Sequence, residues 1–476
     1  MNAKGSTKED ADKEFHKIRF AKRSFLLMSS SILRIAVQLG IVFLYSRKLS
    51  LFDYGLYQSV WLYISLASVI SLFGLPALIL TSSLNNIRHY AATHKKQFIL
   101  FAVLLNLLPL LYIFFTADEF TLLQKLLLFV LITVQNISII TETICIKKEL
   151  ERLVLITNVI FINGYLLLHL LLLYNGYSLL LLLGGLIFLF LFKLIAQFLF
   201  SRSFKSNAED TGSSHIGKQW VYLGLYDVLG IAARWLDKWF ILSFISISQF
   251  AIYFNGAYEI PVFGLMVSAV GNIMLTELSK KNTALVTNIK ILFEKSTTFL
   301  ASFVFPAFCF LFFYHSDFFL LLFSSKYEEA IPVFLIGIFV LPVRITNSAA
   351  ALQACHRNDL IVKGAVLDLL IAVVLMMILY PLFKLNGLAA AFVISTYIQV
   401  GYYLWHTGKI INKSISYFFP FKKLLVMLCM AIVVSGGGYY IFKGIAAPFT
   451  IVPGIMICSL LVSVFLHYYY KKQHFK

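Results

Sequence analysis

Long runs of apolar residues, separated by short polar segments, extend over almost the whole chain. The runs are about 20 residues long, which is the length that a helix needs to cross roughly 30 Å of hydrocarbon. The short alternating segments typical of transmembrane β-barrels are absent from the sequence. The pattern therefore predicts an all-α polytopic membrane protein. We expect about fourteen transmembrane helices, near residues 24–46, 54–80, 98–116, 121–146, 153–174, 178–200, 219–245, 249–276, 297–315, 329–355, 359–381, 387–406, 421–442 and 448–469.

Composition supports this interpretation. The chain has 476 residues, of which 60% are hydrophobic and 13% charged, whereas soluble domains carry roughly 25% charged residues. The charged head of the chain continues into a full-length apolar segment without a small-residue cleavage site. We therefore expect this segment to remain as a helix rather than to act as a cleaved signal peptide.

The positions of the basic residues predict the orientation. If the N-terminus is cytoplasmic, most of the 40 Lys and Arg residues lie on the cytoplasmic side, as the positive-inside rule requires. An even number of spans then places both termini in the cytoplasm. The net charge of +18 is explained by this topology and by attraction to anionic lipid head groups. It does not indicate nucleic-acid binding.

The polar segments also suggest how the chain is divided. We predict a basic cytoplasmic arm (1–23), an N-terminal six-helix bundle (24–200), a cytoplasmic linker (201–218), a C-terminal six-helix bundle (219–406), and two additional helices with a basic tail (407–476). The linker is assigned because it is rich in Ser, Gly and charged residues.

A weak internal repeat supports the two halves. The segment LSLFDYGLYQSV (49–60) follows the first predicted span, and ISISQFAIYFNG (245–256) follows the seventh. The corresponding pairs are Leu49/Ile245, Ser50/Ser246, Leu51/Ile247, Leu56/Ile252 and Tyr57/Tyr253. Six crossings separate the copies, so the halves would be parallel repeats about an axis along the membrane normal.

The seventh span, YDVLGIAARWLDKWFILSF (226–244), contains four charges. On a helix Asp227, Arg234 and Lys238 lie on one face, with Asp237 on an adjoining face. Arg234 lies about 14 residues into its span, roughly 21 Å deep at 1.5 Å per residue. Two interpretations stay open. The charges either neutralise one another in structural pairs, or form a cationic face on a water-filled path for an anionic cargo group.

Two further arginines lie deep in predicted spans. Arg34 shares a helical face with Gln38 in the first span, and Arg344 lies in the tenth. Arginine keeps its charge at physiological pH and binds phosphate oxygens with two parallel hydrogen bonds. These residues are therefore candidates for substrate binding. A role in helix packing is the alternative for each of them.

Intramembrane carboxylates form a second set of candidates. Glu142, Glu259 and Asp368 could each exchange H⁺ or hold Na⁺, as a coupled transporter requires. Glu259 lies beside Pro261, where a broken helix would free carbonyl groups for a cation. The alternative for Glu142 is an ordinary interfacial residue, because it lies near the cytoplasmic end of its span.

Motifs of enzymes and metal sites are missing from the sequence. The five cysteines are scattered without CxxC spacing, and the ten histidines show no ligand spacing. No phosphate-binding loop or dinucleotide fingerprint occurs. We therefore expect no cofactor, no metal and no enzymatic activity. If transport is coupled to an ion, we expect that ion to be H⁺ or Na⁺.

Short motifs resemble those of a known family. They are LSLFDYGLYQSVW (49–61), FGLPALI (73–79), LDKWFILSFISISQFAIYFNGAYEI (236–260) and SSKYEEAIPVFLIG (324–337). Together with the layout, they resemble the polysaccharide transporter branch of the multidrug/oligosaccharidyl-lipid/polysaccharide (MOP) exporter superfamily, the Wzx-type O-antigen flippases. The cations Arg34, Arg234, Lys238 and Arg344 cannot be matched to family positions, so their candidacy rests on depth and helical face alone.

The resemblance implies a MATE/MOP-like pair of six-helix bundles plus a C-terminal helix pair, alternating access and a bacterial inner-membrane location. It implies a polyprenyl-pyrophosphate-linked glycan as cargo, moved from the cytoplasmic to the periplasmic leaflet, with the pyrophosphate in a cationic cavity. A polysaccharide polymerase and glycosyltransferases are the partners that it suggests, besides the lipid bilayer. The alternatives are a lipid II flippase, a cation-coupled multidrug antiporter, and a membrane scaffold for glycosyltransferases.

Overall fold

The computed structural model describes the chain outside residues 1–31, 203–215, 280–284, 356, 444–450 and 475–476. All regular secondary structure in the described part is helical, which confirms the predicted all-α class. The predicted arm (1–23) and residues 203–215 of the predicted linker (201–218) lie outside the described residues, whereas the two ends of the linker belong to α8 and α9.

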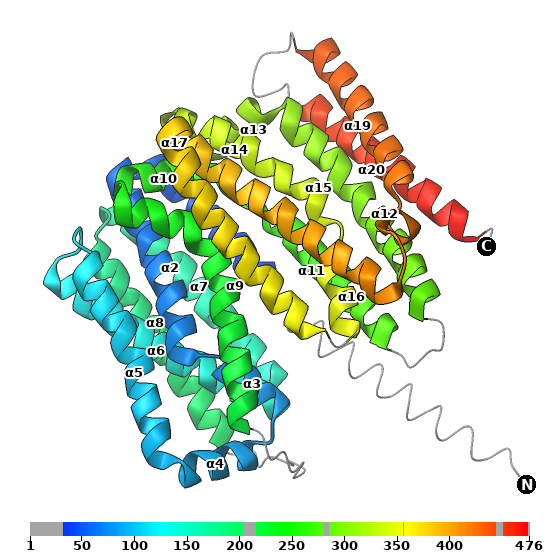
Figure 1. The fold of residues 1–476 in the computed structure, drawn as a ribbon. Helices are drawn as coiled ribbons and strands as arrows, with labels where there is room; N and C mark the ends of the chain where they lie inside the picture. Colours follow the sequence, from blue (N-terminus) through cyan, green and yellow to red (C-terminus); the bar gives the residue numbers. More distant parts are fainter. Residues whose placement is uncertain (1–31, 203–215, 280–284, 356, 444–450, 475–476) are drawn as a thin grey trace, which may run out of the picture. The chain divides into compact units, whose positions relative to one another are not determined.

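Long helices alternate with shorter ones along the described chain (Figure 1). Residues 32–48 form the first described helix. It is followed by α2 (Leu51–Leu72), α3 (Leu75–Thr81), α4 (Leu84–Thr93), α5 (Lys95–Thr116), α6 (Leu122–Lys147), α7 (Glu151–Asn175), α8 (Leu179–Arg202) and α9 (Ile216–Phe244). Then come α10 (Ile247–Gly256), α11 (Pro261–Ser279), α12 (Leu285–Phe313), α13 (His315–Phe323), η1 (Ser325–Ala330), α14 (Ile331–Gly337), η2 (Ile338–Val340), α15 (Leu341–Arg344), α16 (Ser348–Ala354), α17 (Asn358–Ile411), α18 (Ile415–Phe418), α19 (Phe421–Phe442) and α20 (Ile451–His474).

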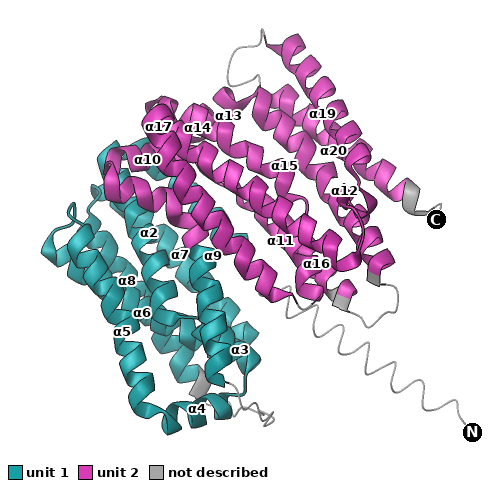
Figure 2. Ribbon diagram, viewed as in Figure 1, with its two compact units in different colours: residues 1–231 teal, residues 232–476 magenta. Residues whose placement is uncertain are grey.

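The chain divides into two compact units, residues 1–231 and 232–476 (Figure 2). In unit 1, α6 packs against α8 and α3, and α7 packs against α8. In unit 2, α12 packs against α19, α20 and α11. The boundary between the units falls within α9, whereas the sequence suggested a second bundle that begins at residue 219. The predicted limits were drawn from the sequence repeat, whereas the two units are defined by their compactness. The predicted bundles therefore stay a prediction.

Ten helices of the described chain are long and apolar enough to cross a membrane, or eleven if α10 and α11, bent by 56° at a short break, count as one span. The chain is thus a multi-pass membrane protein. Helix α9, with its charges, is not among the ten, and the first helix is only partly described. The number fourteen stays a prediction.

Helix α17 contains two antiparallel segments. Its 54 residues are interrupted at Lys384, which adopts φ 51° and ψ −132°. Beyond this break the chain returns along itself, since the Tyr403 hydroxyl donates to the Ile361 carbonyl at 2.9 Å. A straight helix of this length would measure roughly 81 Å, far more than the bilayer. The two segments match the predicted spans 359–381 and 387–406.

Span two differs from the prediction because its helix is broken. We expected one helix over 54–80, but α2 ends at Leu72 and α3 begins at Leu75. Phe73 and Gly74 between them have positive φ angles of 38° and 74°. A Cβ on Gly74 would lie 2.4 Å from the backbone nitrogen of Gly224. Glycine is therefore required here both by conformation and by close packing.

The repeated segments begin their helices in the same way. Ser50 caps α2 by accepting a hydrogen bond from the Asp53 backbone, and Ser246 caps α10 by accepting one from the Gln249 backbone. Each serine thus satisfies an amide group that the first helical turn leaves without a partner. Ser50 and Ser246, which the weak repeat aligns with each other, therefore have the same structural role.

Helix α10 of unit 2 approaches η1 and α14 closely at Gly256. A Cβ placed on Gly256, at the end of α10, would lie 2.8 Å from the Val333 Cβ and 2.9 Å from the Ala330 carbonyl oxygen. Both distances are shorter than normal contacts. The packing of α10 on α14, which positions the site described below, therefore requires glycine at position 256.

We predict that Gly256→Ala lowers the free energy of unfolding by about 1–3 kcal/mol, since overpacking forces the backbone apart. The measurement is thermal unfolding of the full chain in detergent. Gly264→Ala in α11 is the matched control, because a Cβ there meets nothing within 4 Å. Equal melting temperatures for both variants would contradict the packing argument.

Candidate functional site

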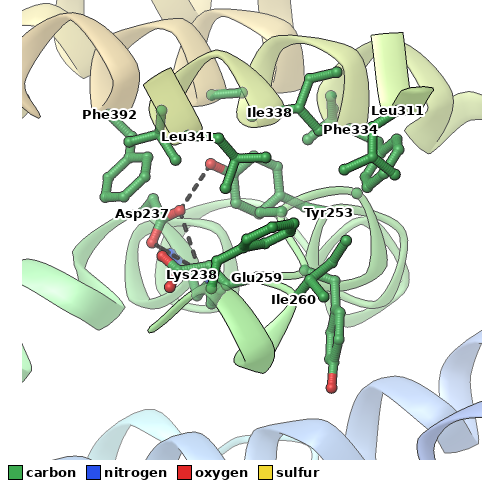
Figure 3. A pocket seen from close by; sticks show the side chains of 18 of the residues that line it. Asp237, Lys238, Tyr253, Glu259, Ile260, Leu311, Phe334, Ile338, Leu341 and Phe392 are labelled. Carbon is green, nitrogen blue, oxygen red and sulfur yellow. Dashed lines mark hydrogen bonds and ion pairs between the residues drawn. The ribbon is translucent and has the colours of Figure 1, made fainter. Parts of the chain in front are cut away.

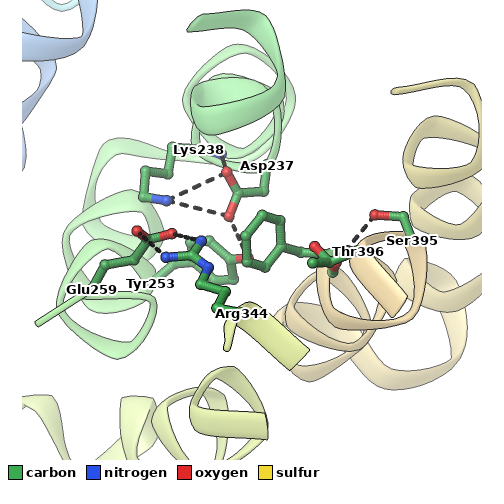
Figure 4. Close-up of polar contacts among 8 residues, drawn as sticks. Asp237, Lys238, Tyr253, Glu259, Arg344, Ser395 and Thr396 are labelled. Carbon is green, nitrogen blue, oxygen red and sulfur yellow. Dashed lines mark hydrogen bonds and ion pairs between the residues drawn. The ribbon is translucent and has the colours of Figure 1, made fainter. Parts of the chain in front are cut away.

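In unit 2, α9 contributes an ion pair between adjacent residues. Asp237 is 3% exposed, and the Tyr253 hydroxyl donates to its Oδ2 at 2.8 Å. Lys238 Nζ lies 3.4 Å from both carboxylate oxygens of Asp237. The partner of Asp237 is therefore its own neighbour rather than Arg234, one helical turn earlier (Figure 4).

A second ion pair joins two distant segments of unit 2. Arg344 donates to Glu259 through both terminal nitrogens, at 2.8 and 2.7 Å (Figure 4). This two-pronged geometry is the strongest form of charge-assisted hydrogen bonding. The side chains are 30% and 46% exposed, respectively. Arg344 and Glu259 thus neutralise each other at a partly open position.

Both partners of this pair lie where a span is broken. Glu259 lies in the non-helical segment between α10 and α11, as expected beside Pro261. Arg344 is the last residue of the helical run from Ile331 through α15, and the helix resumes only at Ser348. A carboxylate just before a helix and a cation at a helix end both complement the helix dipole. Each helix break therefore stabilises the charge that lies beside it, Glu259 before α11 and Arg344 at the end of α15.

These charges line a small cavity in unit 2, together with apolar side chains such as Phe334 and Leu341 (Figure 3). Its volume is about 50 Å³, and a single water needs roughly 10–15 Å³. The cavity can hold a few water-sized molecules. In this conformation it cannot enclose a pyrophosphate that carries sugars.

Unit 1 contains a third ion pair. Lys193 on α8 lies 2.6 Å from Glu142 on α6, with side chains only 7% and 19% exposed. Asn158 on α7 donates to the other Glu142 oxygen at 3.0 Å, and Lys193 Nζ lies 5.4 Å from the centre of the Phe161 ring. The pair therefore connects three helices.

Three other predicted site residues, Arg34, Gln38 and Arg234, lie outside these pairs. Arg34 and Gln38 lie exposed on the first described helix, and Arg234 is exposed on α9. Within the described parts of the chain, no carboxylate lies within ion-pairing distance of either arginine. Arg34 and Arg234 are thus exposed cations without a carboxylate partner in the part of the chain that the structure describes.

Two predicted carboxylates have no ion-pair partner among the residues that the structure describes. Asp227 is half-buried on the part of α9 that belongs to unit 1. Asp368, on the first segment of α17, has a buried Oδ1 atom without a hydrogen-bond partner there. The structure does not bring Asp368 into the cluster around Asp237 and Glu259, because it does not line their cavity.

Sequence reasoning missed three residues that these sites use: Tyr253, Lys193 and Asn158. Tyr253 appeared only as one position of the repeat. Lys193 gave a usable signal, because a single cation in an otherwise apolar span requires a partner. The described residues contain no group of three or more His, Cys, Asp or Glu side chains that could hold a metal ion.

Several solved structures have a similar arrangement of helices. The lipid II flippase MurJ, in an inward closed conformation, is similar with a TM-score of 0.64 and 15% identity over 95% of this chain and 99% of that chain. An inward-facing multidrug resistance MATE transporter of the MOP superfamily has a TM-score of 0.54 and 14% identity, over 80% and 98%. The eukaryotic MATE transporter AtDTX14 has a TM-score of 0.54 and 13% identity, over 87% and 99%.

The chain therefore has a MATE/MOP-like fold. The MATE/MOP-like architecture expected from the sequence is thereby confirmed. No protein-family model and no curated protein sequence matches the chain. The similarity to the MurJ structure extends over 95% of this chain and therefore involves both units.

We predict that Lys193→Met lowers the free energy of unfolding by about 3–5 kcal/mol, because it leaves the Glu142 carboxylate buried without a counter-charge. Replacing both partners, as Glu142→Gln with Lys193→Met, should restore most of this loss, since an amide can keep the hydrogen bond to Asn158. Chemical or thermal unfolding in detergent measures the difference. Lys96→Met, at an exposed lysine, is the control. A single variant as stable as the wild type would show that the pair does not hold α6 to α8.

Proposed function

We propose that this protein is a flippase that moves undecaprenyl-pyrophosphate-linked oligosaccharide, such as an O-antigen repeat unit, from the cytoplasmic to the periplasmic leaflet by alternating access. The MOP fold supports a transporter, and the motifs of the sequence favour the polysaccharide branch. The remaining support comes from the chemistry of the deep charges.

One observation carries the proposal: of the five cations that lie well inside predicted spans, three are paired with carboxylates and two are not. Lys193, Lys238 and Arg344 are each neutralised by a carboxylate. Arg34 and Arg234 are exposed and have no ion-pair partner in the described chain. An unpaired charge at this depth is costly unless it serves a function. A pyrophosphate would supply the missing negative charge, and guanidinium groups bind its oxygens with two hydrogen bonds each.

The pattern of ion pairs indicates which carboxylate could couple transport to an ion. Glu142, Glu259 and Asp237 already have cationic partners, so an ion would have to displace a lysine or an arginine. Asp368 has a buried oxygen without a partner among the described residues. We therefore propose that Asp368 is the residue that exchanges H⁺ or holds Na⁺, if transport is coupled.

The setting of this function is part of the proposal. A flippase of this kind belongs in the bacterial inner membrane, with both termini in the cytoplasm. Its cargo comes from glycosyltransferases on the cytoplasmic face and is passed to a polysaccharide polymerase. No nucleic acid takes part.

A lipid II flippase is the second candidate. It is favoured by the likeness to MurJ, with a TM-score of 0.64, and its cargo presents the same pyrophosphate chemistry. Depletion distinguishes the two, because loss of lipid II transport lyses cells whereas loss of a polysaccharide flippase removes surface polysaccharide. A multidrug antiporter is less favoured, since its usually cationic cargo would be repelled by Arg34 and Arg234.

We predict that the double variant Arg34→Ala with Arg234→Ala inserts normally but lowers surface polysaccharide at least tenfold in the host. Each lost charge-assisted hydrogen bond costs about 1.5–3 kcal/mol, or roughly tenfold or more. Polysaccharide staining and membrane protein level are measured together. Arg152→Ala, at an exposed arginine at the start of α7, should leave the output unchanged. Normal output from the double variant would refute the role of these arginines.

A further inference from the structure

Unit 2 contains a cationic pocket in the turn between α17 and α18, which shares no residue with the cavity beside Glu259. Its lining includes Trp405, Lys409, Lys413 and Ile415. The volume is about 410 Å³, far larger than that of the cavity. The residues that line the pocket include two lysines and no carboxylate. The pocket therefore offers positive charge that its own lining does not neutralise.

The backbone of this turn is fixed by hydrogen bonds and by packing. The Lys413 amide donates to the Gly408 carbonyl at 3.0 Å. Asn412, between them, ends α17 in the left-handed conformation with φ 52°, as is common at helix ends. The short helix α18 then packs on α12, where the buried Phe418 ring lies 5.1 Å from the Phe293 ring, measured between centres. The turn is therefore a preformed part of unit 2.

Three ammonium groups around this turn lie on aromatic rings. Lys409 Nζ is 3.6 Å from the centre of the Trp405 ring. Lys413 Nζ and Lys290 Nζ, the latter from α12, are 5.5 and 4.6 Å from the centre of the Tyr417 ring. The last two charges share one ring, so they are no farther apart than these two distances added together. A cation–π contact attracts an ammonium group to the ring but leaves its positive charge in place.

No carboxylate of the described chain relieves the repulsion among these lysines. None lies within ion-pairing distance of Lys290, Lys409 or Lys413. The Glu294 carboxylate, one turn after Lys290 on α12, lies 3.7 Å from Lys423 instead. An anion from outside the protein would therefore lower the repulsion.

The position of the pocket selects the kind of anion. Both α17 and α19 are apolar enough to cross a membrane, so the short connection between them lies at the membrane surface. Trp405 and Tyr417 are 49% and 37% exposed there, and these residue types are enriched where hydrocarbon meets head groups. Anionic head groups attract lysines at this level. A free anion would use the lysines alone, whereas a phospholipid also uses the apolar surface of Trp405 and Ile415.

We propose that this pocket binds the head group of one anionic phospholipid, such as phosphatidylglycerol, with its phosphate between the ammonium groups of Lys409 and Lys413. Lys290 supplies a third positive charge from α12. Trp405 and Ile415 contact the acyl chains. The site contains none of the residues assigned to the cargo, so it stands independently of the proposed function.

The fluorescence of Trp405 tests the proposal on the full chain in detergent. The other four tryptophans are replaced by Phe: Trp61, Trp220, Trp235 and Trp239. The protein is titrated with phosphatidylglycerol brominated in its acyl chains, which quenches a tryptophan that it contacts. Each lysine near an anionic lipid contributes about fivefold in affinity. Lys409→Gln with Lys413→Gln should therefore raise the concentration for half-maximal quenching by about tenfold or more, and brominated phosphatidylcholine should bind the parent chain correspondingly less well.

Two matched double variants separate charge at the pocket from net charge and from side-chain shape. Lys95→Gln with Lys96→Gln removes the same charge from exposed lysines at the start of α5 and should leave the quenching unchanged. Lys409→Arg with Lys413→Arg keeps the charge and should bind phosphatidylglycerol as the parent chain does. Native mass spectrometry of chains that keep all five tryptophans should give the same order of lipid retention.

Four outcomes would overturn the proposal. Equal quenching by the two lipids, or an equal loss in the two glutamine double variants, would show that these lysines do not select an anionic lipid. Displacement of phosphatidylglycerol by inorganic phosphate, but not by sodium chloride of the same ionic strength, would assign the pocket to a free anion. Displacement by polyprenyl pyrophosphate at lower concentrations than by unbrominated phosphatidylglycerol would assign it to the cargo.

Discussion

The cost of placing charge in hydrocarbon determines much of this structure. Three of the five deep cations are neutralised by carboxylates, and two of these pairs join segments far apart in the sequence. Lys193 and Glu142 hold α8 to α6 with a contact of 2.6 Å. Arg344 and Glu259 connect the end of α15 to the segment before α11. The charges that appear least compatible with a membrane therefore fix the packing within each unit.

The same constraint acts on the backbone. Non-helical backbone inside a membrane is tolerated only where protein or a polar cavity surrounds it. In unit 2 the break between α10 and α11 and the break after α15 lie beside Glu259 and Arg344, and both residues line the small cavity. Each break supplies a helix end whose dipole favours the charge placed there. Ion pairing and helix interruption are therefore parts of one arrangement.

The sequence predicted the helices well because hydrophobic length is a local property. It also predicted the interruption at Pro261 and the equivalence of Ser50 and Ser246, which depend on local backbone chemistry. It could not predict which charges pair. Helical spacing placed Arg234 one turn from Asp237, yet Asp237 binds Lys238 and the Tyr253 hydroxyl. That choice depends on how α10 packs against α9, and therefore on tertiary contacts that no helical periodicity contains.

The three ion pairs also differ in how readily a conformational change could open them. Arg344 binds Glu259 at 2.7 and 2.8 Å, and Lys193 binds Glu142 at 2.6 Å. Lys238 stays 3.4 Å from both oxygens of Asp237, beyond the usual range for N–H···O bonds. Asp237 also keeps the hydrogen bond from Tyr253, so its carboxylate retains a partner if Lys238 moves. Of the three pairs, Asp237–Lys238 therefore has the longest and weakest direct contact. Because it adjoins Arg234 on α9, movement there would change the electrostatic environment of the exposed arginine without breaking the contacts that hold the helices together.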